Sequence, residues 1–256
     1  MTPPRSTASL CTLTLTATGG ESTGAYSYSV SAGGTASGCA IASGRLTSTS
    51  AGTCLVVVTK ATNTSYLAIS SDPTLVTLNT APQAALKVTS TSSTYGTPLT
   101  LTTSGGSGTG SVTYTVVNGT ATGCTLTSGV LTTTSAGTCF VTATKAADTN
   151  FNSVSSSATT VTIAKATQTA LVLTSTSGKV GSALLLTYSG GSGTGAVSFS
   201  IVAGGTASGA KINKSVGNAW YLTVTGAGTV NIVVKQATDS NYLAAQSANT
   251  AVTFDK

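Results

Sequence analysis

The sequence predicts an all-β protein of three tandem β-sandwich domains in an elongated array. The first observation is a repeat, because Cys39 and Cys124 are 85 residues apart and so are Cys54 and Cys139. The second is the alternation of apolar residues with Thr or Ser in every copy, which is typical of strands with one buried face. The third is that no stretch shows a helical period in a chain with only 6% charged residues.

A repeat of this length gives each copy room for its own small core, so we expect separate domains rather than the blades of one closed fold. The expected domains are repeat 1 (1–80), repeat 2 (81–165) and repeat 3 (166–256). Counting back 86 residues from the first strand of repeat 2 puts the equivalent strand of repeat 1 at about 0–2, so repeat 1 lacks most of it. Its bare sheet edge could accept a strand from a neighbouring molecule, which is a route to self-association.

Repeat 2 shows the expected strands most clearly. Apolar residues alternate with Thr or Ser in about seven short segments, at 85–89, 97–103, 111–116, 124–127, 130–133, 138–144 and 158–163. Ser128 and Gly129 form the turn of a hairpin between the fourth and fifth segments. Turn signals every 8–12 residues are typical of an immunoglobulin-like sandwich.

Two kinds of turn contain residues that could be mistaken for a binding or catalytic site. The glycine-rich segments 105–110 and 190–195 precede strands, whereas a phosphate-binding loop needs a helix N-terminus behind it, so we interpret them as chain reversals. Asp148 and Asp239 occupy equivalent corner positions in different repeats, and we expect them to form Asx-type turns, as Asn63 does in repeat 1.

Several motifs of repeat 2 together resemble a known family. They are Gly-Gly-Ser-Gly-Thr-Gly at 105–110 followed by Val-Thr-Tyr-Thr-Val, then Ser-Ala-Gly-Thr-Cys at 135–139 and Thr-Lys-Ala-Ala-Asp-Thr-Asn-Phe at 144–151. The chain resembles the bacterial immunoglobulin-like repeats found in tandem in large surface proteins and adhesins. The resemblance covers nearly the whole chain, and it implies stalks, adhesive tips or filament subunits rather than one function.

The cysteines predict two disulfides. Repeat 3 has Ala210 and Val230 where the other repeats have cysteines, so both partners are lost together. A bonded pair has reason to be lost as a pair, and we therefore expect the bonds Cys39–Cys54 and Cys124–Cys139, which imply an oxidising compartment. The alternative is a metal site, but two thiols in a domain without His do not complete a zinc sphere. Cys11 is left over, either as a small buried hydrophobe or as an intermolecular thiol.

Repeat 3 also carries an insertion. Ala210 and Val230 are 20 residues apart against 15 for each cysteine pair, so about five extra residues lie within 211–221. This segment holds the only Trp of the chain, Trp220, followed by Tyr221. The pair could contact a ligand by stacking on a sugar ring or by anchoring a protein partner. The alternative is that Trp220 fills the volume left by the missing disulfide.

Composition and charge exclude several function classes. The net charge of +6 comes from 11 basic and 5 acidic residues, and the basic ones do not form the stripe that nucleic-acid binding needs. No apolar run is long enough to span a bilayer, so we expect no membrane insertion. Without His and with few acidic residues we expect no catalytic residues, no metal site and no cofactor.

These observations together favour a structural and adhesive module outside the cell, as part of a bacterial surface protein or fibre with an unidentified cell-surface or matrix ligand. A phage virion decoration or fibre protein is the first alternative, and it would explain why no apolar segment follows Met1 to form a signal peptide. An accessory carbohydrate-binding module is the second alternative, and it depends on Trp220 and Tyr221.

Overall fold

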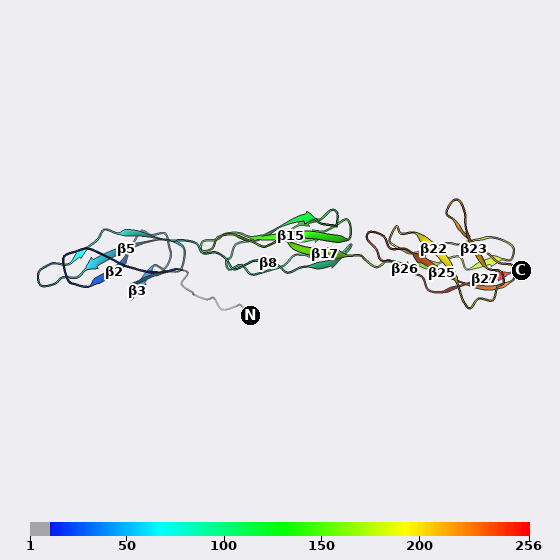
Figure 1. Cartoon of the computed structure of the whole chain (residues 1–256), viewed down its shortest axis with the longest axis horizontal. Coiled ribbons are helices and arrows are strands. Elements are labelled where there is room, and N and C mark those ends of the chain that lie inside the picture. Colours follow the sequence, from blue (N-terminus) through cyan, green and yellow to red (C-terminus); the bar gives the residue numbers. More distant parts are fainter. Residues whose placement is uncertain (1–10) are drawn as a thin grey trace. The chain divides into compact units, whose positions relative to one another are not determined.

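The computed structural model describes residues 11–256, and every regular element in that range is a β-strand (Figure 1). The chain divides into two compact units. Unit 1 consists of Met1–Thr89, Thr103–Tyr114 and Thr142–Ala158, and unit 2 of Ser90–Thr102, Thr115–Val141 and Thr159–Lys256. The division passes through repeat 2, so the three domain boundaries given above remain a prediction.

Repeat 1 contributes two sheets to unit 1. Its strands are β1 (Cys11–Thr14), β2 (Tyr26–Ser31), β3 (Ala40–Ala42), β4 (Arg45–Ser48), β5 (Gly52–Lys60), β6 (Ile69–Ser70) and β7 (Thr74–Leu78). One sheet has the order β1-β4-β3, and in the other β5 pairs with β2, β6 and β7. The position expected for the missing first strand lies outside the described residues.

Repeat 2 forms three sheets. Its strands are β8 (Lys87–Val88), β9 (Ser92–Thr94), β10 (Leu99–Thr100), β11 (Thr103–Ser104), β12 (Val112–Asn118), β13 (Thr125–Thr127), β14 (Val130–Thr132), β15 (Gly137–Lys145), β16 (Val154–Ser155) and β17 (Thr159–Ala164). The sheet orders are β12-β15-β17-β9, β10-β14-β13 and β11-β8, with β16 paired to β15. Strands β15 and β17, drawn as neighbouring green arrows in Figure 1, are antiparallel, whereas β9 runs parallel to β17.

Repeat 3 reproduces this arrangement within unit 2. Its strands are β18 (Val172–Leu173), β19 (Ser177–Lys179), β20 (Leu184–Leu185), β21 (Tyr188–Ser189), β22 (Val197–Val202), β23 (Lys211–Lys214), β24 (Trp220–Thr223), β25 (Gly228–Gln236), β26 (Ala245–Gln246) and β27 (Thr250–Asp255). The orders are β19-β27-β25-β22, β20-β24-β23 and β18-β21.

This strand order is that of an immunoglobulin-like sandwich. In repeat 2, β8, the β10–β11 pair, β14 and β13 correspond to strands A, B, E and D, while β12, β15 and β17 correspond to C, F and G. The predicted all-β sandwich fold is therefore confirmed by the topology itself. Among the strands of residues 11–256, no sheet mixes strands from different sequence repeats.

The strand expected at 97–103 is divided into β10 and β11, and the cause is a side chain. The Ser90 hydroxyl accepts the N–H of Thr102 at 2.8 Å and donates to the carbonyl of Thr100, so it replaces the backbone ladder at this point. Ser175 accepts the N–H of Thr187 in the same way in repeat 3. A hydroxyl that competes for backbone groups interrupts regular pairing, and no hydrophobic pattern reveals it.

Every second residue of the central strands forms the core. Cys139, Val141 and Ala143 of β15 are fully buried, as are Leu131 in β14 and Val161 in β17. The same alternation buries the core of repeat 3, which consists of Leu171, Leu173, Leu186, Phe199, Leu222, Val224, Val230, Ile232, Val234, Val252 and Phe254. One buried face per strand is what the Thr-apolar alternation predicts.

The tight hairpins have the expected turn chemistry. Ser128 and Gly129 both have positive φ, at 50° and 77°, as do Ser43 and Gly44 at 48° and 72°. Two successive left-handed residues give a turn whose twist matches the flanking strands. In repeat 3 the hairpin is longer, and it is closed by a bond from the Ser215 N–H to the Ala219 carbonyl at 2.8 Å.

Candidate functional site

The cysteine pairs lie where the two sheets of a repeat approach each other. Cys39 precedes β3 and is bonded to Cys54 in β5, with Cα atoms 6.1 Å apart. Cys124 precedes β13 and is bonded to Cys139 in β15, with Cα atoms 6.2 Å apart. Cys54 and Cys139 are fully buried, whereas Cys39 and Cys124 are partly buried, so each bond joins the two sheets from the core outward. Cys11 begins β1, and its side chain lies outside the described residues.

A hollow lies beside the inserted hairpin of repeat 3. It has a volume of about 430 Å³. The lining residues come from β20–β22 and from the β23–β24 hairpin, and they are Leu186, Tyr188, Ala196, Val197, Phe199, Lys214, Asn218, Ala219 and Trp220. Aromatic walls with a few polar groups at the rim are typical of small-ligand sites.

Three aromatic rings form one wall of this hollow. The Phe199 ring lies 6.0 Å from the Trp220 ring at an interplanar angle of 56°, and 6.1 Å from the Tyr188 ring at 68°. Phe199 is buried in the core, whereas Trp220 is partly buried and Tyr188 is 40% exposed. The core thus supports Trp220 from behind and leaves part of its ring accessible.

The Lys214 side chain places a positive charge at the edge of the same hollow. The Lys214 ammonium lies 5.3 Å from the centre of the Trp220 ring, within cation–π distance. Asn218, whose positive φ of 63° forms the hairpin turn, adds an exposed amide. A ligand in the hollow would therefore meet an aromatic face, a positive charge and a hydrogen-bonding group.

The two residues singled out by the sequence do not act together. Trp220 lines the hollow, but Tyr221 does not. Adjacent residues of a strand point to opposite faces, and Tyr221 pairs in register with Leu185 and Asn213. Tyr188, Phe199 and Lys214 were not predicted from the sequence as wall residues. Phe199 could have been suspected, because it stands where repeats 1 and 2 have Tyr28 and Tyr114.

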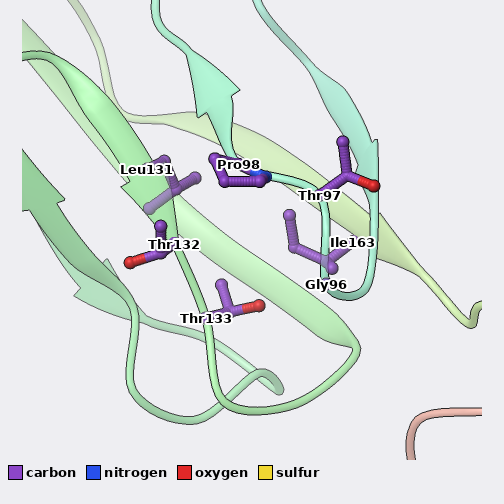
Figure 2. Close-up of a pocket in the computed structure, with 7 residues that line it drawn as sticks. All are labelled: Gly96, Thr97, Pro98, Leu131, Thr132, Thr133 and Ile163. Carbon is purple, nitrogen blue, oxygen red and sulfur yellow. The ribbon is translucent and has the colours of Figure 1, made fainter.

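A smaller hollow of about 90 Å³ lies in repeat 2 (Figure 2). It is lined by the loop before β10, by β14 with the residue after it, and by β17, through Gly96, Thr97, Pro98, Leu131, Thr132, Thr133 and Ile163. None of these side chains ionises at physiological pH, so the hollow offers no acid, base or metal ligand.

Asp148 in repeat 2 and Asp239 in repeat 3 serve as turn-forming groups. The pKa of Asp148 is lowered to about 2, first by the N–H of Thr109 and then by those of Asn150 and Phe151. The pKa of Asp239 is also lowered to about 2, first by the N–H of Asn241 and then by that of Thr194. A carboxylate held ionised by backbone donors is a poor general acid or base near neutral pH. Among residues 11–256, no cluster of three or more His, Cys, Asp or Glu side chains could hold a metal ion.

Within the described range, no helix has the length and apolar character needed to cross a membrane.

Comparison with known proteins finds similarity to solved structures at low sequence identity. No family model and no curated protein matches the chain. Among solved structures, the Escherichia coli adhesin FdeC is 17% identical, with 91% of this chain and 85% of that chain covered and a TM-score of 0.31. The S-layer protein rSbsC(31-844) is 16% identical, with 90% and 35% covered and a TM-score of 0.31. Drosophila N-cadherin EC1-4 is 10% identical, with 93% and 69% covered and a TM-score of 0.29.

Proposed function

We propose that this protein is a non-catalytic structural and adhesive module that works outside the cell, as part of a bacterial surface protein or fibre. The observation that carries this proposal is the repeated sandwich with its two disulfides, Cys39–Cys54 and Cys124–Cys139. Disulfides persist in oxidising compartments and are rare in the cytosol. A chain of similar modules with sparse charge is suited to carry weak binding sites outward, where several together give useful affinity.

Counting the thiols tests the oxidised state on which this proposal depends. The chain has five cysteines, so protein isolated from its producing cell should show one reactive thiol in denaturant before reduction and five after it. Five thiols before reduction would mean that the bonds do not form, and the extracellular proposal would then lose its main support.

The hollow beside Trp220 favours a sugar as the ligand of this module. A partly exposed indole supported by Phe199 offers a flat apolar face, and Lys214 and Asn218 lie at the rim to bind polar groups. The nearby ammonium favours a sugar that carries a carboxylate or sulfate, because opposite charges attract across a partly desolvated site. The accessory sugar-binding alternative shares Trp220 with this proposal, but its second residue, Tyr221, does not line the hollow.

A glycan array with three variants of the full chain tests this ligand class. We expect binding to acidic glycans that is lost in Trp220→Ala and weakened about tenfold in Lys214→Ala, in the range of a charge-assisted hydrogen bond. Tyr221→Ala is the matched control, because this aromatic neighbour does not line the hollow. Lys214 is exposed, so its variant remains informative even where Trp220→Ala loosens the core. Equal binding by wild type and Lys214→Ala would contradict the acidic sugar, and no binding at all would contradict the sugar class.

A further inference from the structure

The corner loops between the last two long strands of each repeat share one backbone arrangement. In repeat 2 the Asp148 Oδ1 accepts the N–H groups of Asn150 and Phe151, each at 2.9 Å, and the Asp148 N–H donates to the Phe151 carbonyl. Repeat 3 repeats the arrangement with Asp239, Asn241 and Tyr242. We call residues 148–151 and 239–242, with their equivalent 63–66 in repeat 1, the corners.

Two corners are bound to the preceding repeat by the same side-chain hydrogen bond. The Ala51 N–H donates to the Asn150 Oδ1 at 3.0 Å, and both residues belong to unit 1. The Ala136 N–H donates to the Asn241 Oδ1 at 3.0 Å, and both belong to unit 2. Each donor is the Ala of an Ala-Gly-Thr sequence at the start of a long strand. We call this Ala N–H the socket.

The residue that links the repeats reinforces each corner. Ala81 donates to the Asn150 carbonyl and accepts from the Asn152 N–H, which makes a parallel bridge to the corner. Ala166 bridges Tyr242 in the same way. In unit 2 the Tyr242 ring also packs edge-on against Tyr95, with ring centres 5.6 Å apart.

One corner and one socket are left without a partner in the described chain. The third Ala-Gly-Thr sequence begins at Ala227, which is exposed, whereas Ala51 and Ala136 are partly buried. The N–H of Ala227 has no acceptor among residues 11–256. At the corner of repeat 1, Tyr66 is 48% exposed and Leu67 is 90% exposed.

The corner of repeat 1 already has the backbone conformation of the two corners that contact a preceding repeat. The Asn63 Oδ1 accepts the N–H groups of Ser65 and Tyr66, each at 2.9 Å, and the Asn63 N–H donates to the Tyr66 carbonyl. No rearrangement of the loop is needed to present Ser65 where the other corners present Asn. The Ser hydroxyl is shorter than the Asn amide, so contact through this corner should be weaker than within the chain.

We propose that the Ala227 socket binds the corner of repeat 1 from a second copy of this chain, which joins copies head to tail. The two internal contacts define the kind of partner that fits the socket, and residues 63–66 supply it. Lys256 supports this occupant, because it holds the register position of Lys165, whose ammonium donates to the carbonyl of Asp239 in the adjoining corner. A heterologous contact of this kind joins two different surfaces, so each copy can bind two others and the products are chains or rings rather than a two-fold dimer.

Sedimentation velocity over a wide concentration range tests the proposal on the full chain. All proteins carry Cys11→Ser, so that no intermolecular disulfide contributes. Ser65→Asn restores the stronger acceptor and should tighten self-association by about two- to tenfold, the value of one ordinary hydrogen bond. Thr80 and Asn152, which hold the positions of Lys256 and Leu67, are hydrogen-bonded at the first internal contact, so Leu67→Lys should abolish association by bringing two cations together. Ala227→Pro should abolish it by removing the donor.

Ala227→Lys covers the socket with a long side chain at an exposed position, so it replaces the Pro variant if that one does not fold. A mixture gives the sharpest result. Leu67→Lys retains its socket and Ala227→Lys retains its corner, so each alone should stay monomeric while the mixture forms dimers and nothing larger. Monomers at every concentration in both the parent and Ser65→Asn, or association that these variants leave unchanged, would overturn the proposal.

Discussion

Repeats 2 and 3 build the same sandwich with different interiors. Repeat 2 joins its sheets through Cys124–Cys139, whereas repeat 3 has Ala210 and Val230 at those positions. Repeat 3 has the larger Phe254, which is 1% exposed, where repeat 2 has Ile163, and this ring belongs to the same core cluster as Val230. A disulfide acts mainly by restricting the unfolded chain, while a larger side chain acts by filling the folded core.

The large side chain of Phe254 lies opposite a glycine on the neighbouring strand. Gly178 of β19 is the direct register partner of Phe254, and Ser93 is the corresponding partner of Ile163 in repeat 2. A Cβ atom on Gly178 would lie 2.7 Å from a ring carbon of Phe254, which is closer than a real Cβ atom approaches its neighbours. Trp220, the other candidate for the vacated volume, also packs against this core, with its ring next to that of Phe199. The comparison shows that a lost cross-link and a repacked core can coexist in one fold.

Removing the cross-link of repeat 2 should have the largest effect. Cys124→Ala with Cys139→Val gives repeat 2 the residues of repeat 3, and it should lower the free energy of unfolding by about 3 kcal/mol for a loop of this length. Calorimetry of the full chain should show one transition moved down while the others stay. Cys39→Ala with Cys54→Val is the matched control and should move a different transition. Unchanged transitions in both would mean that the bonds do not contribute to stability.

Replacing Gly178 and Phe254 by the residues of repeat 2 should have an intermediate effect on stability, and the effects of the two substitutions should be coupled. Gly178→Ser alone should destabilise by about 1–3 kcal/mol, because the new side chain collides with the Phe254 ring. Adding Phe254→Ile, as in repeat 2, should recover part of that loss. A double-mutant cycle from denaturant unfolding measures the coupling, and additive effects would show that the two positions do not compete for space.

Acid should destabilise repeats 2 and 3 more than repeat 1, and this should be the smallest of the three effects. Asp148 and Asp239 have pKa values lowered to about 2, so their contribution is complete above the unfolded pKa of about 4 and is lost as the pH falls toward 2. Repeat 1 has the neutral Asn63 in this position, with its amide donating to Thr23. Asp148→Asn with Asp239→Asn should therefore flatten the fall of the thermal midpoint between pH 4 and pH 2. An identical fall in the variant would assign the acid sensitivity to other groups.

Local patterns in the sequence determined the strands and the disulfide partners. Alternation along one strand reports its buried face without reference to any other part of the chain, so β12, β14 and β15 were predictable. The paired loss at Ala210 and Val230 pointed to the bonded cysteines for a similar reason, because three copies of one module can be compared directly. Strand β9 was not predictable, since Ser92–Thr94 has no apolar alternation and becomes a strand only by pairing with β17.

Only the tertiary structure decided which groups meet across the sandwich and across the repeats. The sequence marked Trp220 and Tyr221 as neighbours, but the register of β24 directs Trp220 alone into the hollow with Lys214 and Phe199. It marked Asp148 as a turn residue, but not that Asn150 accepts the N–H of Ala51, 99 positions earlier in the chain. Such contacts depend on how separate elements pack, and no local period encodes them.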